Sequence, residues 1–554
     1  MINKIIVPLS IVLGSIFAQA EINFSYEMKY GDGKQVTSTL SGNPDTSAYN
    51  YFENLLDINT NFGDNLYIYS QFEYSNPPVF GFKRTTIDSV MSTFYLEYSN
   101  DRYNVKLGDI FELYGRGMSF YTLHDQSIDY NNSIKGFTLN YSIRDNLEFS
   151  TLLGKGDYFY RSNPSNRLTD YSFETNVFLG SINYVNNLIG DIQYSYIKQK
   201  STLSPELIKK IYNNTFEISV ELKESKRADS YKNYFLFNQG IGMADTIIAN
   251  CYNLNWNNFL GPFDIYIDKA WVNYDKIYGD EVFGSRFYTA VYTDFMGTGI
   301  TYEYKNYNTP YLIKTLSNPP IVYRVGSSVL ASRNAHSINF GNEIGHQVDF
   351  NRQLFDNINV LGNLSLSYRH QKEGMADLSI LEFLTMNENS EIYDYYPFRQ
   401  MYLEMNGWAF SEQIYYKIGM DHYTEFIGGK NTFALTFPTH WVYKLSNGNS
   451  LTIYLENQEK TVKRFAPGSY TSNYTSISYS QRGRWIITGF YDQEISKSKT
   501  TQWPGIDFTF YLNSESQISL FYGSQKGGLV CANGICAEQP GFEDGVKITF
   551  RSLF

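Results

Sequence analysis

The last eleven residues of the chain, 544–554, read Asp-Gly-Val-Lys-Ile-Thr-Phe-Arg-Ser-Leu-Phe. Side chains along a β-strand point alternately to opposite faces. One face of this stretch is almost wholly apolar and consists of Val546, Ile548, Phe550, Ser552 and Phe554. The other face carries Lys547, Thr549, Arg551 and Leu553. An oily face toward lipid, a wet face toward the interior and an interfacial aromatic residue are what the closing strand of an outer-membrane β-barrel requires.

The same period of two recurs along the chain, for example in residues 137–143, 364–369, 451–456 and 508–512. A soluble β-sandwich shows the same period, but with its apolar face turned to a core. The length of the runs distinguishes the two folds. The runs 170–185 and 432–445 exceed ten residues. A tilted membrane strand needs ~9–11 residues, whereas globular strands usually have ~5–6. The sequence therefore predicts an all-β, antiparallel transmembrane β-barrel.

The first twenty residues have the pattern of a signal peptide. Lys4 supplies the positive start, residues 5–17 are apolar, and Ala18-Gln19-Ala20 is a typical cleavage site. The apolar run is shorter than the ~20 residues of a membrane helix. We therefore expect residues 1–20 to be a cleaved signal peptide and residues 21–554 to form a single barrel domain in the cell outer membrane.

The composition agrees with a membrane barrel. Tyr, Phe and Trp number 50, 40 and 6 and make up 17% of the chain, which fits strands and the aromatic girdles of a barrel. The mean hydropathy of −0.36 resembles that of a soluble protein. However, lipid-facing and lumen-facing residues cancel in such an average. The net charge of −11 and the lack of a basic stripe argue against nucleic-acid binding.

Turn signals alternate between short and long. Short ones occur at Gly63-Asp64, Asn100-Asp101 and Asn447-Gly448, and a long one covers residues 522–543. Outer-membrane barrels have short periplasmic turns and long extracellular loops. This alternation predicts about 26 strands, with a range of 22–28. The count is open at two places, because residues 21–41 form one or two strands and residues 308–345 could hide a hairpin.

Cysteine is scarce, at three residues. Cys531 and Cys536 are separated by Ala-Asn-Gly-Ile, a loop short enough for a disulfide, and export permits one. The loop parity places this pair outside the cell. Cys251 lies in a strand-like run and is expected to be a small buried hydrophobic residue.

One segment departs from plain alternation. Residues 108–118 read Gly-Asp-Ile-Phe-Glu-Leu-Tyr-Gly-Arg-Gly-Met. We interpret it as part of a loop folded into the lumen, where carboxylates hold an arginine at a constriction, since such charge rings tune pore selectivity. The candidate constriction residues are Asp109, Glu112, Arg116 and Asp125. The alternative is an ordinary ion pair that anchors a surface loop.

Three stretches carry a resemblance to a known family. They are residues 108–118, Asp-Tyr-Asn-Asn-Ser-Ile-Lys-Gly at 129–136, and Gly-Gly-Leu-Val-Cys-Ala-Asn-Gly-Ile-Cys at 527–536. Together they resemble an uncharacterised outer-membrane β-barrel family of Gram-negative bacteria that carries a domain-of-unknown-function label. Leu113-Tyr114 departs from the family's more usual aromatic-acidic-aromatic run. The resemblance implies a barrel, but neither an activity nor any site residues.

Enzyme signatures are absent from the sequence. Gly-x-Ser-x-Gly does not occur, and the six histidines show no metal-binding spacing. We therefore predict no enzymatic activity and no cofactor. Strand pattern begins at Ile22, which disfavours a separate plug domain ahead of the barrel.

Two functions fit such a barrel. The first is a porin-like channel or transport protein, because a wide barrel can enclose an aqueous lumen. The second is a structural or secretion-assembly barrel with a plugged lumen that binds a partner protein. The candidate plugs are residues 111–133, 308–343 and 371–398. The other expected partners are outer-membrane lipid and the barrel-assembly machinery.

Overall fold

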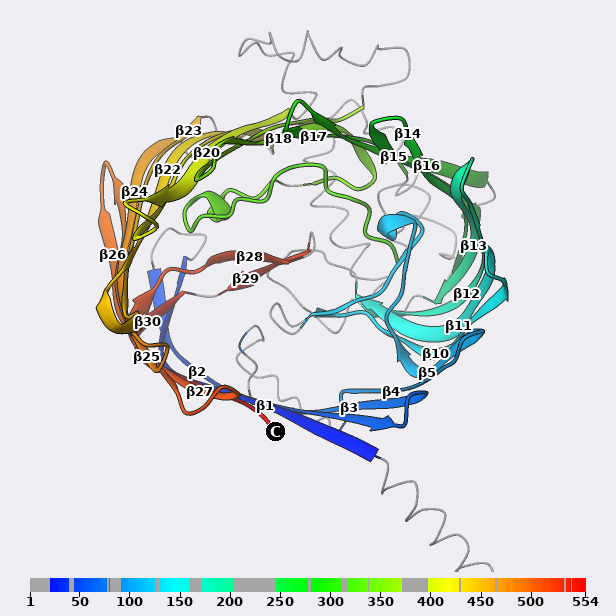
Figure 1. The fold of residues 1–554 in the computed structure, drawn as a ribbon, viewed down its shortest axis with the longest axis horizontal. Helices are drawn as coiled ribbons and strands as arrows, with labels where there is room; N and C mark the ends of the chain where they lie inside the picture. Colours follow the sequence, from blue (N-terminus) through cyan, green and yellow to red (C-terminus); the bar gives the residue numbers. More distant parts are fainter. Residues whose placement is uncertain are drawn as a thin grey trace, which may run out of the picture.

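A computed structural model gives the structure of the chain, and it describes residues 20–38, 44–76, 79, 91–125, 130–159, 172–202, 246–277, 280–309, 316–336, 338–370, 397–427, 430–463, 467–532, 535–539 and 541–554. These residues form a closed, antiparallel barrel of 24 strands (Figure 1). Among the described residues, no helix has the length and apolar character needed to cross a bilayer.

The strands of the wall are β1 (Ala20–Ser38), β2 (Pro44–Phe62), β3 (Leu66–Ser75), β4 (Thr93–Ser99), β5 (Tyr103–Ile110), β10 (Ile134–Arg144), β11 (Leu147–Phe159), β12 (Ser172–Asn186), β13 (Gly190–Thr202), β14 (Thr246–Leu260), β15 (Phe263–Ile277), β16 (Asp280–Phe295), β17 (Thr298–Asn308), β18 (Asn342–Phe355), β19 (Ile358–Tyr368), β20 (Phe398–Ala409), β21 (Ile414–Ile427), β22 (Lys430–Lys444), β23 (Ser450–Lys463), β24 (Gly468–Gln481), β25 (Trp485–Ser496), β26 (Thr500–Tyr511), β27 (Ser516–Gln525) and β30 (Phe542–Leu553). Each strand pairs with its neighbours in the chain order of the wall, and β30 pairs with β1 to close the ring.

The first and last strands make the closing seam. Its register pairs Tyr26 with Ser552 and Tyr30 with Ile548. The amide of Phe24 donates to the carbonyl of Phe554 at 3.0 Å, and the amide of Phe554 donates back at 2.8 Å. Strand closure satisfies the backbone groups that an open sheet edge would leave unpaired, which is why barrels can stand in a membrane. The terminal strand therefore has the role that its sequence predicted.

The wall has the expected two faces. Exposed apolar side chains lie on the outer face of many strands, among them Leu153, Phe178, Trp271, Leu403, Phe437, Ile477 and Val546. On the inner face of the seam, Arg551 Nε lies 2.6 Å from Glu27 Oε1. Ser552, the polar residue on the outer face of β30, is buried, and its hydroxyl pairs with that of Ser516 at 2.7 Å. The alternation thus sorts side chains between a lipid face and a lumen face.

The wall contains 24 strands instead of about 26, a number inside the predicted range. At both places where the strand count was open, the structure has the smaller number of strands. Residues 20–38 form the single strand β1, and the chain between β17 and β18 holds no wall hairpin among its described residues. Alternation within a segment does not show whether the segment finds partners in the wall, so a count made from sequence errs there.

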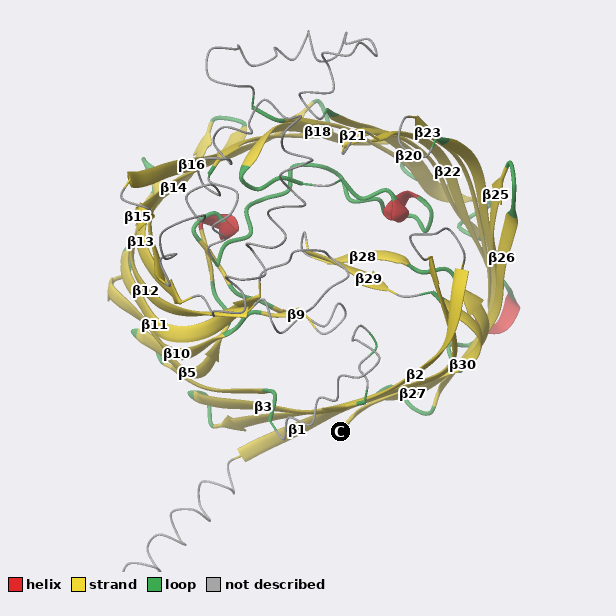
Figure 2. Ribbon diagram, turned by 180° about the vertical axis from the view of Figure 1, so that it is seen from behind, coloured by secondary structure: helices red, strands yellow, loops and turns green. Residues whose placement is uncertain are grey.

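The turns at one end of the barrel are short, as predicted, but the connections at the other end vary, from two residues between β21 and β22 and three between β25 and β26 to the long segments between β13 and β14 and between β17 and β18. The short ones, at residues 63–65, 261–262, 356–357 and 482–484 among others, define one end of the barrel, which we call the tight-turn end. The connections of varied length define the opposite end, which we call the long-loop end. Three of these connections have described residues inside the ring of strands (Figures 1 and 2).

Candidate functional site

The candidate functional site is the lumen, which three inserts enter from the long-loop end. The first is the arginine loop, Phe111–Asp125, with the short strands β6 (Leu113–Tyr114), β7 (Phe120–Tyr121) and β8 (His124–Asp125) and the 3-10 turn η1 (Gly115–Gly117). The second is the luminal belt, Leu316–Gly341, with the turn η5 (Ala331–Arg333). The third is the hairpin of β28 (Gly528–Ala532) and β29 (Ile535–Gln539), which reaches into the ring in Figure 1.

Glycine geometry shapes the tip of the arginine loop. Gly115 and Gly117 have φ angles of 57° and 84°, a region that only glycine adopts at little cost. A Cβ at Gly115 would lie 2.6 Å from Asn253 Oδ1 and 2.8 Å from Asp268 Oδ2 on the inner wall. Arg116 between them also has a positive φ of 45°. The Gly-Arg-Gly sequence thus lets the backbone turn tightly against the wall and present the arginine.

Arg116 lies between two tyrosines of the wall. Its guanidinium carbon is 3.8 Å from the ring centroid of Tyr266 and 5.6 Å from that of Tyr288. Nη1 of Arg116 also donates to the hydroxyl of Tyr288 at 3.2 Å. Each tyrosine in turn donates to a carboxylate, Tyr266 to Asp268 at 3.0 Å and Tyr288 to Glu303. The arginine, which remains exposed, is therefore linked through aromatic rings to two wall acids.

The four predicted constriction residues lie along this loop but have different surroundings. Asp109 is buried at the end of β5, where it accepts from the Phe94 amide at 2.8 Å and from Ser133 Oγ at 3.0 Å. Burial raises the pKa of Glu112. The positive charge of Lys106 opposes this increase in pKa, and the negative charge of Glu97 adds to it.

Asp125 is half-buried in β8, opposite Tyr130. The aromatic and acidic neighbours of Arg116 on β15, β16 and β17 could not be identified from sequence, because they are more than 140 residues away in the chain. That the four residues form a constriction remains a prediction.

The base of the arginine loop packs on an apolar patch of the inner wall. Met118 and Phe120 are fully buried. They belong to one cluster with inward-facing wall residues from β11 to β17, including Leu152, Leu179, Ile197, Cys251, Val272 and Tyr307. Cys251 is buried and free, as the sequence predicted. The lumen is thus not uniformly polar, because this part of the wall is apolar where an insert covers it.

The belt adjoins the arginine loop and is bonded to it. The amide of Tyr121 donates to Leu316 O at 2.9 Å, and the amide of Asn318 donates to Gly117 O at 2.9 Å. Buried Arg286 of the wall donates from Nη1 to Met118 O at 2.7 Å and to Ser317 Oγ at 2.9 Å. The two inserts therefore form one body with the wall at this point.

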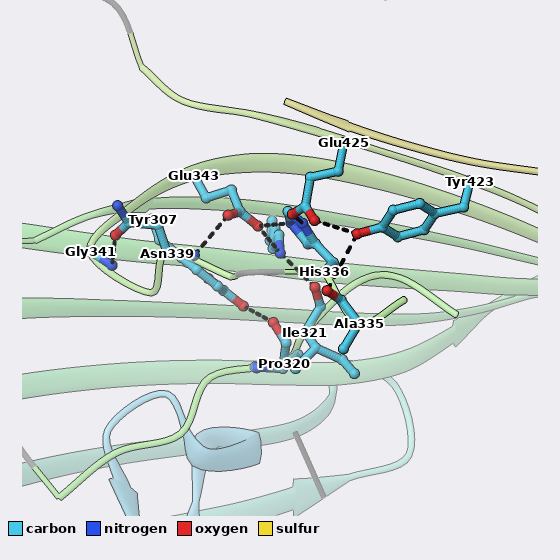
Figure 3. A network of polar contacts seen from close by, with 11 residues as sticks. Tyr307, Pro320, Ile321, Ala335, His336, Asn339, Gly341, Glu343, Tyr423 and Glu425 are labelled. Atoms are coloured by element: carbon cyan, nitrogen blue, oxygen red, sulfur yellow. Dashed lines mark hydrogen bonds and ion pairs between the residues drawn. The ribbon is translucent and has the colours of Figure 1, made fainter. Parts of the chain in front are cut away.

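A buried ionic cluster, which we call the latch, holds the end of the belt that leads into β18 (Figure 3). The Glu343 carboxylate lies 2.5 Å from Lys305 Nζ and 3.2 Å from His336 Nε2, and it accepts from the Asn339 amide at 2.8 Å. His336 Nδ1 is 2.7 Å from Glu425 Oε1. The side chains of the latch are almost fully buried, with exposed fractions of 0% for Lys305, 4% for His336, 3% for Glu343 and 9% for Glu425. Water therefore cannot take the place of a missing partner.

Aromatic rings and backbone carbonyls complete the latch. The His336 ring stacks on Phe398 with centroids 4.1 Å apart and meets the edge of Tyr323 at 5.4 Å. Lys305 also donates to Ile321 O at 2.5 Å. Burial lowers the pKa of His336, but Glu343 and Glu425 together outweigh burial and raise it above its usual value. The imidazolium form is therefore favoured between the two acids.

Further contacts hold the belt around the wall. Glu456 accepts from Ser328 Oγ at 2.5 Å and from the Ala331 amide at 3.2 Å. Arg333 forms a bidentate pair with Asp492 at 3.3 and 2.5 Å. At the other end, the Leu316 amide donates to Gln199 Oε1 at 2.8 Å. Wall residues from β13 to β25 thus attach the belt over roughly half of the ring.

Two of the three inserts were predicted from the sequence. Residues 111–133 and 308–343 were candidate plugs, and their described parts lie inside the ring. The third candidate, residues 371–398, lies outside the described residues except for Pro397 and Phe398. The β28–β29 hairpin was not predicted as an insert, although it contacts η5 of the belt.

The hairpin carries the two remaining cysteines. Its register pairs Cys531 directly with Cys536. Directly opposed residues in an antiparallel pair have Cα atoms ~4.5–5.5 Å apart, within the ~4.4–6.8 Å that a disulfide spans. The backbone thus suits the predicted disulfide, which remains a prediction.

Within the described parts of the chain, no cluster of three or more His, Cys, Asp or Glu side chains could hold a metal ion. The fold and the inserts define a transmembrane β-barrel with a lined lumen.

The N-terminal part of the chain matches the model of a known protein family. The model of a family of unknown function (DUF6029) matches residues 9–248, which confirms the resemblance seen in the sequence. No curated protein matches the sequence.

Among solved structures, the chain is similar to "Copper transporter OprC", at 7% identity and a TM-score of 0.42 over 97% of this chain and 80% of that one. It is also similar to the siderophore receptor PirA from Pseudomonas aeruginosa, at 7% identity and a TM-score of 0.43 over 96% and 80%. A third similar structure is the FrpB iron transporter from Neisseria meningitidis, at 7% identity and a TM-score of 0.40 over 98% and 84%.

Proposed function

We propose that the protein is an outer-membrane channel for small hydrophilic solutes, narrowed by a fixed internal constriction. The observation that carries this proposal is the luminal belt. It lies inside the ring (Figure 2), attached to inward-facing side chains of the wall from β13 to β25. A wide barrel encloses an aqueous lumen unless something fills it. A belt held along the wall narrows the lumen and adds polar and charged groups to it.

The proposed location is the outer membrane. The apolar outer face needs lipid, and the alternating strands suit a bilayer. We expect removal of residues 1–20 on export and insertion by the barrel-assembly machinery. N-terminal sequencing of the membrane-extracted protein should therefore begin at Glu21, whereas a start at Met1 would contradict cleavage.

Planar-bilayer recording of the purified full-length protein tests the function. We expect steady openings that are smaller than those of a variant without the belt. Asn308 and Asn342 pair directly across β17 and β18, so a short Gly-Ser turn can replace residues 310–340 without moving either strand. A clear rise in conductance in that variant supports a belt that narrows an open lumen. Silence of both proteins contradicts the proposal.

A second function rests on the hairpin. β28 contacts η5 on the belt, so the hairpin and the belt adjoin one another inside the ring. This contact favours a plugged barrel that binds a partner protein through its long-loop end. Silence in the bilayer, together with a stoichiometric partner after mild detergent extraction, would support this second function.

A further inference from the structure

A continuous chain of aromatic rings runs around the inner wall on the side away from the arginine loop. Successive ring centroids are 5.3–6.2 Å apart. We call this chain the ring track. Its members, in order, are Trp408, Tyr415, His440, Tyr454, Tyr474, Phe490, Phe521, Phe542, Tyr49 and Tyr51.

Strand register places these rings on the lumen face. Tyr454 is two residues from Glu456, whose carboxylate bonds the belt, so both point inward. Tyr474 pairs with Glu456, and Phe490 is two residues from Asp492, which holds Arg333 of the belt. The other rings share this face through the same cross-strand pairs.

The ring track runs from one end of the barrel to the other. Trp408 and Tyr415 flank the short turn 410–413 at the tight-turn end. Phe490 is near the middle of β25, and Phe542 is the first residue of β30 at the long-loop end.

A glycine keeps the ring track continuous where it crosses β26. Gly505 pairs with Phe490 on one side and Gly523 on the other. A Cβ at Gly505 would lie 2.4 Å from the Phe490 ring and 2.8 Å from the Phe521 ring. The two rings stack over the glycine with centroids 5.8 Å apart and an interplanar angle of 15°. Both rings therefore occupy the space that a side chain at position 505 would need.

The two ends of the ring track differ in exposure. The first six rings, from Trp408 to Phe490, are half-buried. Phe521, Phe542, Tyr49 and Tyr51 are buried in a cluster that also packs Val79. Part of each of these six rings is therefore accessible from the lumen, although the Val329 amide of the belt donates to the Tyr454 hydroxyl at 3.4 Å, while described side chains cover the long-loop half.

Polar groups flank the half-buried rings. The Tyr454 hydroxyl donates to Glu456 at 2.9 Å. Lys417 pairs with Glu404 at 2.8 Å, and Lys444 lies 3.9 Å over the Trp408 ring. Close to Phe490, Thr488 donates to Ser478 at 2.8 Å. Aromatic rings, which are inclined to one another by 15–75°, thus alternate with hydrogen-bonding groups along the wall.

We propose that the ring track binds linear oligosaccharides as they pass through the lumen, an inference that rests on the channel function proposed above. A pyranose unit has an apolar C–H face that stacks on an aromatic ring and a rim of hydroxyls that need hydrogen bonds. A linear chain of such units repeats both features, as the ring track does. A ligand site of this kind combines apolar contact area with a few placed polar groups.

Equilibrium binding of maltohexaose to the detergent-purified full-length protein, measured by titration calorimetry, tests the proposal without depending on ion conduction. Tyr474→Ala, Phe490→Ala and the double variant remove half-buried rings, so the wall should remain folded. We expect each single change to weaken binding by about three- to tenfold, the usual range for one aromatic contact, and the double change to weaken it further. Heat-modifiable migration on gels checks that each barrel is folded.

Two matched variants serve as controls. Phe437→Ala removes an exposed ring from the outer face of β22, and Tyr95→Ala removes an inner-wall ring that stacks on Tyr69, outside the ring track. Both should bind maltohexaose like the unchanged protein.

No binding, or equal binding by all variants, overturns the proposal even if the protein conducts ions. If the protein binds salicylate but not maltohexaose, the oligosaccharide proposal is overturned, and the ring track is a site for flat aromatic acids. Sugar binding by a protein silent in bilayers would reject the channel and keep the ring track as a sugar site.

Discussion

The arginine loop and the luminal belt lie in the same lumen but are held by different forces. The arginine loop docks through fully buried apolar side chains, Met118 and Phe120, on an apolar patch of wall. The belt docks through the latch, where Lys305, His336, Glu343 and Glu425 are buried together. Apolar burial is insensitive to pH and to moderate salt, whereas buried ion pairs depend on the protonation of every member. The belt should therefore be the insert that responds to conditions.

The largest expected effect follows from Glu343→Gln, which breaks the latch. It leaves Lys305 buried with the carbonyl of Ile321 but without its carboxylate. Removing one partner of a buried pair costs about 3–5 kcal/mol. We expect amide exchange in residues 316–341 to accelerate by a corresponding factor while the wall strands stay protected. Unchanged exchange in the belt would show that the latch does not hold it.

Met118→Ala should loosen the other insert. Truncating a fully buried methionine costs about 2–5 kcal/mol through lost burial and the cavity left behind. We expect faster amide exchange in residues 111–125, at equal extent at pH 6 and pH 9 after correction for intrinsic rates. A loss that depends on pH would mean that charge also holds the arginine loop, and the contrast between the two inserts would fail.

The latch should weaken as pH rises. The pKa of His336 is raised in the folded protein, so the imidazolium contributes fully below its usual pKa of about 6.5. This contribution is lost as pH rises through the higher pKa of the folded protein. Each tenfold gain in the proton affinity of the imidazole on folding stabilises the latch by about 1.4 kcal/mol. The groups that face the imidazole are Glu343, Glu425, Lys305, Tyr323, Phe398 and Tyr423.

Belt exchange at pH 6 and pH 9 measures this effect. We expect less protection at pH 9 in the unchanged protein. His336→Gln should be less protected than the unchanged protein at pH 6 and should lose most of the difference between the two pH values. Equal protection at both pH values in the unchanged protein would contradict a charged histidine in the latch.

Arg116→Ala should have a smaller effect on stability and a visible one on permeation. Its cation–π contacts with Tyr266 and Tyr288 are worth about 0.5–1 kcal/mol at an exposed site. Removing an exposed cation from the lumen should shift the reversal potential toward greater cation selectivity in a salt gradient. Arg116→Lys is the matched control, because it keeps the charge. An unaltered reversal potential in Arg116→Ala would remove Arg116 from the constriction.

The smallest expected effect concerns the hairpin. If Cys531 and Cys536 are bridged, neither reacts with a thiol reagent before reduction, and both react after it. Buried Cys251 should stay unlabelled in the folded protein in either state. Labelling of two cysteines without reduction would rule out the bridge.

The residues that decide the architecture could be interpreted locally. Alternation in β30, the short turns and the closing aromatic residue depend only on neighbours in the chain, so barrel, turn parity and closing strand were all predictable. The count of 24 was less so, because the chain between Asn308 and Asn342 carries strand-like residues, and its described residues add no strand to the wall. Local period does not report whether a segment finds hydrogen-bonding partners in the wall.

The lumen shows where local reasoning ends. The sequence singled out Arg116 and its flanking glycines, and the tight backbone path there follows from glycine alone. The partners of that arginine come from β15 and β16, and the latch brings Lys305 and Glu343 together with His336 and Glu425. The ring track likewise joins rings from strands that are far apart in the chain.

The sequence by itself determined a closed, two-faced β wall, because a strand needs only its own alternation to have an oily and a wet side. Only the tertiary structure decided what lies inside that wall. Closure of the ring sets which inward positions of distant strands become neighbours. Those neighbours determine whether an insert meets an apolar patch, a buried pair of charges or a row of rings.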